Sequence, residues 1–226
     1  MLSDAHLTGP DDPVQDRVIA WLDGLDVEHC YLLGDLFHFW WAFDEGGLPE
    51  FAPVLAALAR LRARGVALTL LRGNHDFRLG RVFTEDLGAT VADEVTVVLG
   101  GQRYLLVHGD QPDTSLGYRL TRTVLRSPLF DRFMKSLGPD RARSLGHRLA
   151  GASRHYSDEV SPLLAAQQAW ATDRLAGDVD FVVMGHSHVL GQWELPGGVL
   201  FNLGDFARDR SWLSVTAGGP ALQQLS

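Results

Sequence analysis

The stretch Gly73-Asn74-His75-Asp76-Phe77 decides how this chain is interpreted, because it follows directly on an apolar run at residues 66–71. The run predicts a short buried strand, and the polar residues lie just beyond its carboxyl end. Open α/β sheets place their functional sites at that end of their strands. The same arrangement, an apolar run followed by a short polar motif, recurs in both directions along the chain.

Four further motifs share this arrangement. In chain order they are Asp4-Ala5-His6, Gly34-Asp35, His108-Gly109-Asp110 and Gly185-His186-Ser187-His188. Each is weak alone, but five such motifs in this order are not plausibly accidental. Together they offer candidate metal ligands: Asp4, His6, Asp35, Asn74, His108, His186 and His188. A mixture of carboxylate, amide and imidazole ligands suits Mn²⁺, Fe²⁺ or Zn²⁺.

This ligand inventory is typical of a hydrolase with two metal ions. Two ions held about 3.5–4 Å apart stabilise the attacking and leaving oxygens of phosphoryl transfer and need a bridging carboxylate, for which Asp35 is the candidate. Metal-activated hydroxide would be the nucleophile. His75 follows Asn74 and cannot easily share its ion, so we expect it to bind phosphoryl oxygens or protonate the leaving oxygen. His38 either lines the site or lies outside it.

Composition limits the classes of function. The chain has 226 residues, 46% hydrophobic content and a net charge of −8, which suits one domain over residues 1–226 and argues against nucleic acid as a partner. The single Cys30 lies in an apolar run, which indicates a buried hydrophobe and a reducing, cytoplasmic location. No apolar run is long enough to span a bilayer. Because Asp4 is so near Met1, we expect a very short first strand or a start farther upstream.

The pattern of elements changes along the chain. Asp12-Pro13 predicts a helix start, and strand and helix then alternate through residues 29–33, 51–64 and 66–71. We expect hairpins at Gly100-Gly101, at residues 196–198 and at residues 218–220, with a further strand at residues 181–184. Residues 114–176 show helical patterns only, which indicates a helical cap inserted over the site. The fold class is therefore mixed α/β.

The cap mixes basic and bulky apolar side chains between residues 119 and 137. The set comprises Arg119, Arg122, Arg126, Arg132, Lys135, Leu125, Leu129, Phe130, Phe133, Met134 and Leu137. Such a mixture favours an anionic amphiphile or a membrane surface. The alternative is a helix whose apolar face packs on the core. The two interpretations are compatible.

The five motifs resemble those of the calcineurin-like metallophosphoesterase superfamily. The resemblance implies a two-sheet β-sandwich flanked by helices. It also implies a distribution of ligands between two ions. One ion would take Asp4, His6, Asp35 and His188, and the other would take Asp35, Asn74, His108 and His186.

Within that superfamily the chain is most similar to the UDP-2,3-diacylglucosamine pyrophosphatases of lipid A biosynthesis. The similarity lies in Gly34-Asp35-Leu36-Phe37 with Trp40, in residues 73–80, and in the run from His108 through Asp113 and Tyr118 to Arg119. It implies hydrolysis of a UDP-linked acylated sugar to UMP and 2,3-diacylglucosamine 1-phosphate, dependence on Mn²⁺, and peripheral contact with the inner membrane. Substrate contacts would include Asp113, Arg119, Ser153 and Arg154.

One position departs from that narrower family, which typically has arginine where this chain has His75. Histidine is the usual residue in the wider superfamily. Two alternatives remain open. One is a phosphodiesterase or pyrophosphatase that acts on a soluble nucleotide, and the other is a non-catalytic binding module on the same fold. The sequence leaves the oligomeric state open.

Overall fold

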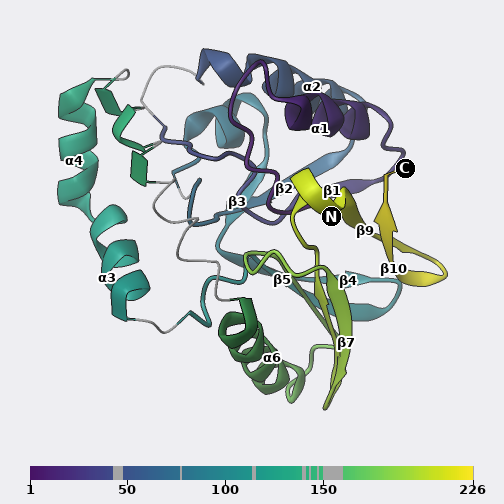
Figure 1. Cartoon of the computed structure of the whole chain (residues 1–226). Helices are drawn as coiled ribbons and strands as arrows, with labels where there is room; N and C mark the ends of the chain where they lie inside the picture. Colours follow the sequence, from purple (N-terminus) through teal and green to yellow (C-terminus); the bar gives the residue numbers. More distant parts are fainter. Residues whose placement is uncertain are drawn as a thin grey trace.

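The computed structural model describes residues 1–42, 48–76, 78–113, 116–138, 141–142, 144–146, 148–149 and 160–225. Two β-sheets lie face to face, and helices cover their outer faces (Figure 1). The expected two-sheet sandwich flanked by helices is confirmed. Phe77, Ser153 and Arg154 lie outside the described residues.

The first sheet is parallel and holds the amino-terminal motifs. Its strands are β1 (His29–Leu32), β2 (Ala67–Leu71) and β3 (Thr90–Ala92), in the order β1-β2-β3. Leu2 forms a parallel bridge to Leu32 on the free side of β1. Met1 in turn exchanges two hydrogen bonds with Leu213 of β9 (Ser211–Thr216), which pairs with β10 (Gly219–Gln224). The segment before Asp4 thus joins the β9–β10 hairpin to this sheet.

The second sheet is mixed and carries the remaining motifs. It consists of β4 (Glu94–Leu99), β5 (Gln102–Val107), β6 (Phe181–Met184), β7 (Gly191–Leu195) and β8 (Gly198–Asn202), in the order β4-β5-β6-β8-β7. Strands β5, β6 and β8 run parallel, whereas β4 and β7 pair antiparallel at the edges. All three hairpins expected from the sequence are present.

Three layers of apolar side chains hold the sandwich together. Tyr31 and Leu71 of the first sheet pack against Tyr104 and Phe201 of the second. Helices α1 (Pro13–Asp23) and α2 (Ala52–Ala63) cover the outer face of the first sheet, and α6 (Val160–Leu175) covers that of the second. The remaining elements are three short helical segments, η1 (Pro49–Phe51), η2 (Val82–Asp86) and α7 (Phe206–Asp209). Cys30 is buried, as expected.

Local sequence signals explain where these helices begin. The side chain of Asp12 accepts a hydrogen bond from the Val14 N–H at 2.8 Å, and Pro13 occupies the first turn of α1. The helix ends at Gly24. Within the part of the chain that the structure describes, no helix has the length and apolar character needed to cross a membrane.

Two helices of the predicted cap, α3 (Leu116–Leu125) and α4 (Pro128–Leu137), lie beside the sandwich (Figure 1). Met134 is fully buried against Phe39 and Trp41, so part of the apolar face packs on the core. Leu129 and Phe133 nevertheless stay 74% and 47% exposed. The interpretation as a helix whose apolar face packs on the core is therefore confirmed for part of α4, whereas contact with an anionic amphiphile or a membrane surface stays a prediction. The limits of the cap as a unit, residues 114–176, stay a prediction.

Candidate metal centre

The five motifs form loops that meet where the strands of both sheets end. Residues 4–6 follow the Leu2 bridge, Gly34-Asp35 follows β1 and residues 73–76 follow β2. Residues 108–110 follow β5, and residues 185–188 follow β6. The two sheets thus bring together side chains as far apart in the sequence as Asp4 and His188.

The backbone at this meeting point is strained. Left-handed φ angles are rare for residues other than glycine and cost about 1–2 kcal/mol each. Six non-glycine residues have positive φ in the described part of the chain, and five of them are predicted ligands. These five are Asp4 (53°), His6 (48°), Asp35 (52°), His186 (68°) and His188 (56°). Strain concentrated in this way is typical of functional sites.

Asp4, His6 and His188 form one group of donor atoms within 4.8 Å of one another. The two Nε2 atoms of His6 and His188 lie 3.1 Å apart, and His188 Nε2 lies 3.3 Å from Asp4 Oδ1. Asp4 Oδ2 accepts hydrogen bonds from the hydroxyl of Ser3 and the N–H of His186. Asp4 Oδ1 is buried without a hydrogen-bond partner. That oxygen is therefore available to a cation.

A second group consists of Asp35, His108 and His186, whose donor atoms also lie within 4.8 Å of one another. His108 Nδ1 donates to the Leu33 carbonyl at 2.8 Å, which turns Nε2 toward the site. His108 Nε2 lies 2.9 Å from the side-chain oxygen of Asn74 and 3.4 Å from Asp35 Oδ2. An imidazole held by a backbone carbonyl at its other nitrogen is the usual arrangement of a metal-ligating histidine.

Asp35 connects the two groups through a single oxygen. Its Oδ1 accepts a hydrogen bond from the His75 N–H at 2.9 Å. Its Oδ2 lies 3.4 Å from His108 Nε2 on one side and 3.9 Å from His6 Nε2 on the other. The donor set and its buried, unpaired oxygen at Asp4 fit two divalent cations that share Asp35.

His75 lies beside this centre. Its Nδ1 donates to the His38 carbonyl at 2.8 Å, and its Nε2 lies 4.0 Å from Asp35 Oδ2. Donor atoms of His38, His6 and His75 also come within 4.8 Å of one another. The structure therefore places His38 at the site and not outside it, which were the two alternatives left by the sequence.

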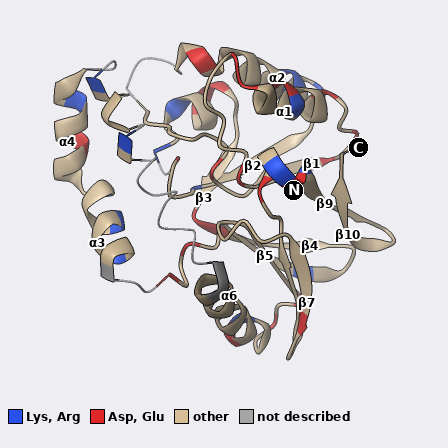
Figure 2. Cartoon of the chain, in the orientation of Figure 1, with Lys and Arg blue, Asp and Glu red and all other residues tan. Residues whose placement is uncertain are grey.

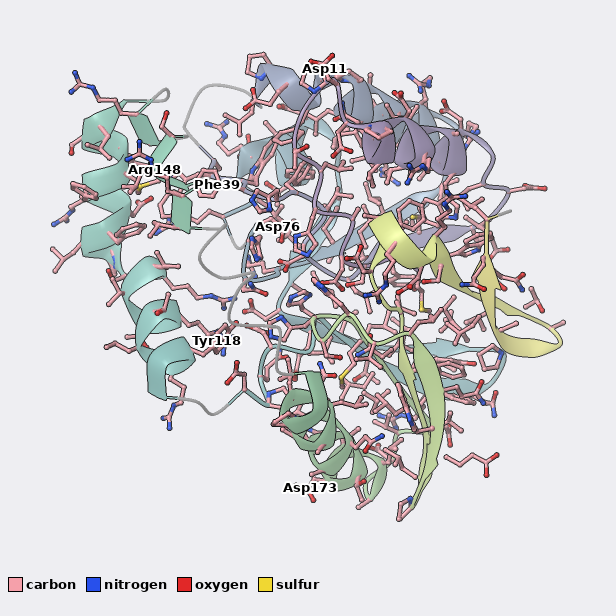
Figure 3. All side chains as sticks on the ribbon, viewed as in Figure 1. Asp11, Phe39, Asp76, Tyr118, Arg148 and Asp173 are labelled. Carbon is pink, nitrogen blue, oxygen red and sulfur yellow. The ribbon has the colours of Figure 1, made fainter. Side chains whose placement is uncertain are left out.

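Asp76 is a buried residue of the site that sequence reasoning did not single out. Its Oδ1 accepts the N–H groups of Asp35 and Gly73, each at 3.0 Å, and its Oδ2 accepts the N–H of Leu36 at 2.7 Å. Figure 3 labels it near the middle of the molecule. Asp76 thus ties the loop after β1 to the loop after β2. Its position in the Gly73–Phe77 motif is the sequence signal that could have identified it as a residue of the site.

The ionisable groups of the site perturb one another strongly. Burial lowers the pKa of His108, but the charge of Asp35 and other acids outweighs it and raises the pKa to about 10. Burial, followed by the charge of His108, lowers the pKa of His186 to about 4. Burial, followed by the charge of Asp35, raises the pKa of Asp76 to about 7. Because a ligating imidazole must be neutral, a cation at His108 would have to displace its proton.

The two predicted substrate contacts that the structure describes, Asp113 and Arg119, have different surroundings. The Asp113 N–H donates to the Asp110 carbonyl at 3.3 Å, next to the centre, whereas the side chain of Arg119 is exposed on α3. Tyr118 and Arg122 approach the site more closely through Asp110. The Tyr118 hydroxyl donates to Asp110 Oδ2 at 2.8 Å, and Arg122 Nε lies 3.2 Å from that oxygen.

A spacing of four residues identifies this inner face of α3. Tyr118 and Arg122 lie one turn apart on α3 and share one side of it. Arg126 directly follows the helix, and its N–H donates to the Arg122 carbonyl at 3.0 Å, which continues the same side. Figure 3 shows Tyr118 between α3 and the sandwich. Arg126 Nη2 lies 3.9 Å from Asp110 Oδ2 and 3.5 Å from the Gly73 carbonyl oxygen, to which it donates. The periodicity could have found these residues, but it does not show which side of the helix faces the site.

Comparison with known proteins gives a consistent result. The family model of calcineurin-like phosphoesterases matches residues 1–190. A protein of Nitrosococcus oceani named UDP-2,3-diacylglucosamine hydrolase is 31% identical over 228 residues, which cover 96% of this chain and 91% of that protein. A protein of the same name from Aeromonas hydrophila is 28% identical and covers 99% and 96% of the two chains.

Two further matches are partial or distant. A Pseudomonas putida protein of that name is 33% identical over 158 residues, which cover 68% of this chain and 65% of its own. The alignment thus spans about two thirds of that relative. Among solved structures, an archaeal phosphodiesterase aligns with 99% of this chain and 97% of its own, with 13% identity and a TM-score of 0.49.

Proposed function

We propose that this chain, which belongs to the calcineurin-like phosphoesterases and is a metal-dependent hydrolase, uses two metal ions that share Asp35. The observation that carries the proposal is the position of Asp35 Oδ2 between two groups of donor atoms. One ion would be held by Asp4, His6, Asp35 and His188. The other would be held by Asp35, Asn74, His108 and His186.

Bound ions supply the positive charge that activates water and stabilises the phosphoryl oxygens. The protein's own contribution is to fix the donors and to hold protons. The carbonyl of Leu33 orients the ring of His108, and the carbonyl of His38 orients that of His75. Because Nδ1 of His75 is engaged there, Nε2 is the atom that can hold a proton near the leaving oxygen. His75 is therefore the proposed acid or phosphoryl-binding group.

The proposed substrate is UDP-2,3-diacylglucosamine, and the proposed products are UMP and 2,3-diacylglucosamine 1-phosphate. The names of the full-length relatives support this substrate. So do the exposed apolar side chains of α3 and α4, among them Leu120 and Leu129. We propose Mn²⁺ as the metal, because it accepts this mixture of oxygen and nitrogen ligands. The same apolar face is the proposed contact with the inner membrane.

Comparison of acylated with deacylated substrate tests this proposal. Phe133 and Leu129 are the residues to replace, since Leu137 belongs to the cluster that holds α4 on Phe39 and its loss would also loosen the cap. Burying one such side chain is worth about 1.5–3 kcal/mol, so each serine variant should raise KM for the acylated substrate by roughly 10- to 100-fold. Hydrolysis of a small chromogenic phosphodiester should stay unchanged.

Val98 provides the control, because it is a 65% exposed apolar residue on β4, away from the cap. Val98→Ser should alter neither activity. Equal turnover of acylated and deacylated UDP-glucosamine by the unmodified enzyme would contradict the lipid substrate and favour a soluble nucleotide. A purified protein that holds no metal and hydrolyses neither compound would instead favour a non-catalytic binding module.

A further inference from the structure

Helix α6 carries a buried polar side chain on the face that it turns toward the second sheet. Gln167 is fully buried, and it lies one and two turns before Ala171 and Leu175, which pack on the apolar side chains of that sheet. Figure 2 shows that charged residues are few on α6. A buried amide destabilises the fold unless its polar atoms are hydrogen-bonded. What Gln167 contributes therefore follows from its hydrogen-bond partners.

The amide nitrogen of Gln167 connects two loops that carry candidate metal ligands. Nε2 donates to the Gly109 carbonyl and to the Gly185 carbonyl, each at 3.0 Å. Gly109 directly follows His108, and Gly185 directly precedes His186. The Gly185 N–H in turn donates to the His108 carbonyl at 2.8 Å. Gln167 thus joins the loop after β5 to the loop after β6, next to two ligands of one proposed ion.

Neighbouring groups fix which way the amide of Gln167 points. Asn202 lies at the end of β8, and its Nδ2 donates to Gln167 Oε1 at 3.1 Å, so the nitrogen of Gln167 faces the two carbonyls. The amide of Asn202 is oriented by its own acceptor, since its Oδ1 accepts the Gly204 N–H at 3.1 Å. Asn202 Nδ2 also donates to the hydroxyl oxygen of Ser187 at 2.8 Å. The hydrogen bonds of this buried network thus allow one orientation of each amide.

The loop after β5 comes close to α6 because Gly109 has no side chain. Its φ is 106°, and a Cβ atom on it would lie 2.9 Å from Gln167 Nε2. The N–H of Gly109 donates to Gln111 Oε1 at 3.2 Å. The N–H and the carbonyl of Gly109 are thus both engaged, and Gln167 is the partner that comes from α6.

We propose that Gln167 is a positioning residue of the metal centre, which sets how closely the rings of His108 and His186 approach one another. The centroids of these two rings lie 5.1 Å apart, and their donor atoms belong to one group. The inference rests on the proposed function, which assigns both histidines to the ion that also takes Asn74. Gln167 donates to the backbone beside each ligand, so its effect reaches the ion through the two loops.

Calorimetric titration of chelator-treated full-length chain with Mn²⁺ tests the proposal. Gln167→Met keeps the length of the side chain and removes both donors. It should weaken the binding of one ion by about 10- to 100-fold, the usual effect of losing a partner that orients ligands, and leave the other ion largely unaffected.

Gln15→Met is the matched control for this titration. Gln15 is also buried, and from α1 its Nε2 donates to the Gly9 and Glu50 carbonyls at 3.1 and 3.5 Å. Gln15→Met therefore removes the same kind of hydrogen bond from the helix that covers the other sheet. It should lose stability and keep both metal affinities.

A graded variant separates the lost hydrogen bonds from general damage to the fold. In Gln167→Glu a buried carboxyl group faces two carbonyl oxygens, which favours its protonated form with one donor. This variant should weaken the same ion, but less than Gln167→Met does. Equal losses in the two variants, or unchanged affinities in Gln167→Met, would refute the positioning role. If Gln167→Met does not fold, Gln167→Glu decides alone, since unchanged affinities in it contradict the proposal.

Nitrogen NMR of labelled histidine identifies the affected ion, with Zn²⁺ as a diamagnetic probe that accepts the same ligands. In Gln167→Met the ring nitrogens of His108 and His186 should respond to Zn²⁺ only at higher concentration, whereas those of His6 and His188 should respond as in the unmodified protein. Fewer than two ions in the unmodified protein would overturn the proposed metal centre, and this inference with it. Two ions there, with an unchanged response of His108 and His186 in the variant, would overturn this inference alone.

Discussion

Replacement of Asp76 by asparagine should weaken metal binding although Asp76 is not a proposed ligand. The carboxylate accepts four backbone N–H groups, from Asp35, Gly73, Leu36 and Phe37, and so fixes the two loops that carry Asp35 and Asn74. Asparagine has nearly the same shape but only one accepting oxygen. Whichever way its amide turns, at least one buried N–H loses its acceptor and faces an NH₂ group instead.

The expected losses of stability and of metal affinity can be estimated from these hydrogen bonds. A buried donor without an acceptor costs about 1–3 kcal/mol. In a chain of this size that cost lowers Tm by roughly 2–10 °C. Partners that orient metal ligands typically change metal affinity by about 10- to 100-fold when they are replaced. We therefore expect a weaker Mn²⁺ affinity in this range, with kcat largely restored at saturating Mn²⁺.

Metal titration monitored by activity and by calorimetry measures both quantities. Asp180→Asn is the control, because Asp180 Oδ2 also accepts a backbone N–H, from Arg103 at 2.7 Å, but lies at the far end of the second sheet. The control should lose some stability and keep its metal affinity. Unchanged Mn²⁺ affinity in Asp76→Asn would refute the argument that this carboxylate positions the ligand loops.

Other consequences of the proposed site can be tested directly. Asp35→Ala should abolish activity and release much of both metals, since one oxygen is asked to serve two ions; elemental analysis that still finds two ions per chain would exclude the bridging role. His75→Ala should retain both metals and reduce kcat by roughly 10²–10⁴-fold, with a smaller loss on substrates that have good leaving groups. Metal loss equal to that of Asn74→Ala would make His75 a ligand instead.

Motifs that follow apolar runs were sufficient to predict the general position of the site. A buried strand must end at one edge of its sheet, so polar residues directly after each run gather there whatever the details of packing. The hairpins were equally predictable, because paired glycines such as Gly100-Gly101 permit the positive φ angles that tight turns require. These features depend on local chain properties.

Features of the cap and of the loops could not be predicted in the same way. The apolar side chains of α4 divide between the Phe39–Trp41 cluster and solvent, and the helical period alone does not show where that division falls. Short strand β3 lacks a run long enough to recognise. The role of Asp76 depends on the loop after β1, about 40 residues earlier.

The amino-acid sequence by itself thus determined the class of fold, the loops that carry the candidate ligands and the kind of chemistry, because each depends on a local pattern of apolar and polar residues. Tertiary structure alone decided that Asp35 Oδ2 lies between two donor groups and that Gln167 of α6 reaches the loops beside His108 and His186. Both arrangements join residues far apart in the chain. Their geometry is set by how closely the two sheets and the cap helices pack, and no local pattern records it.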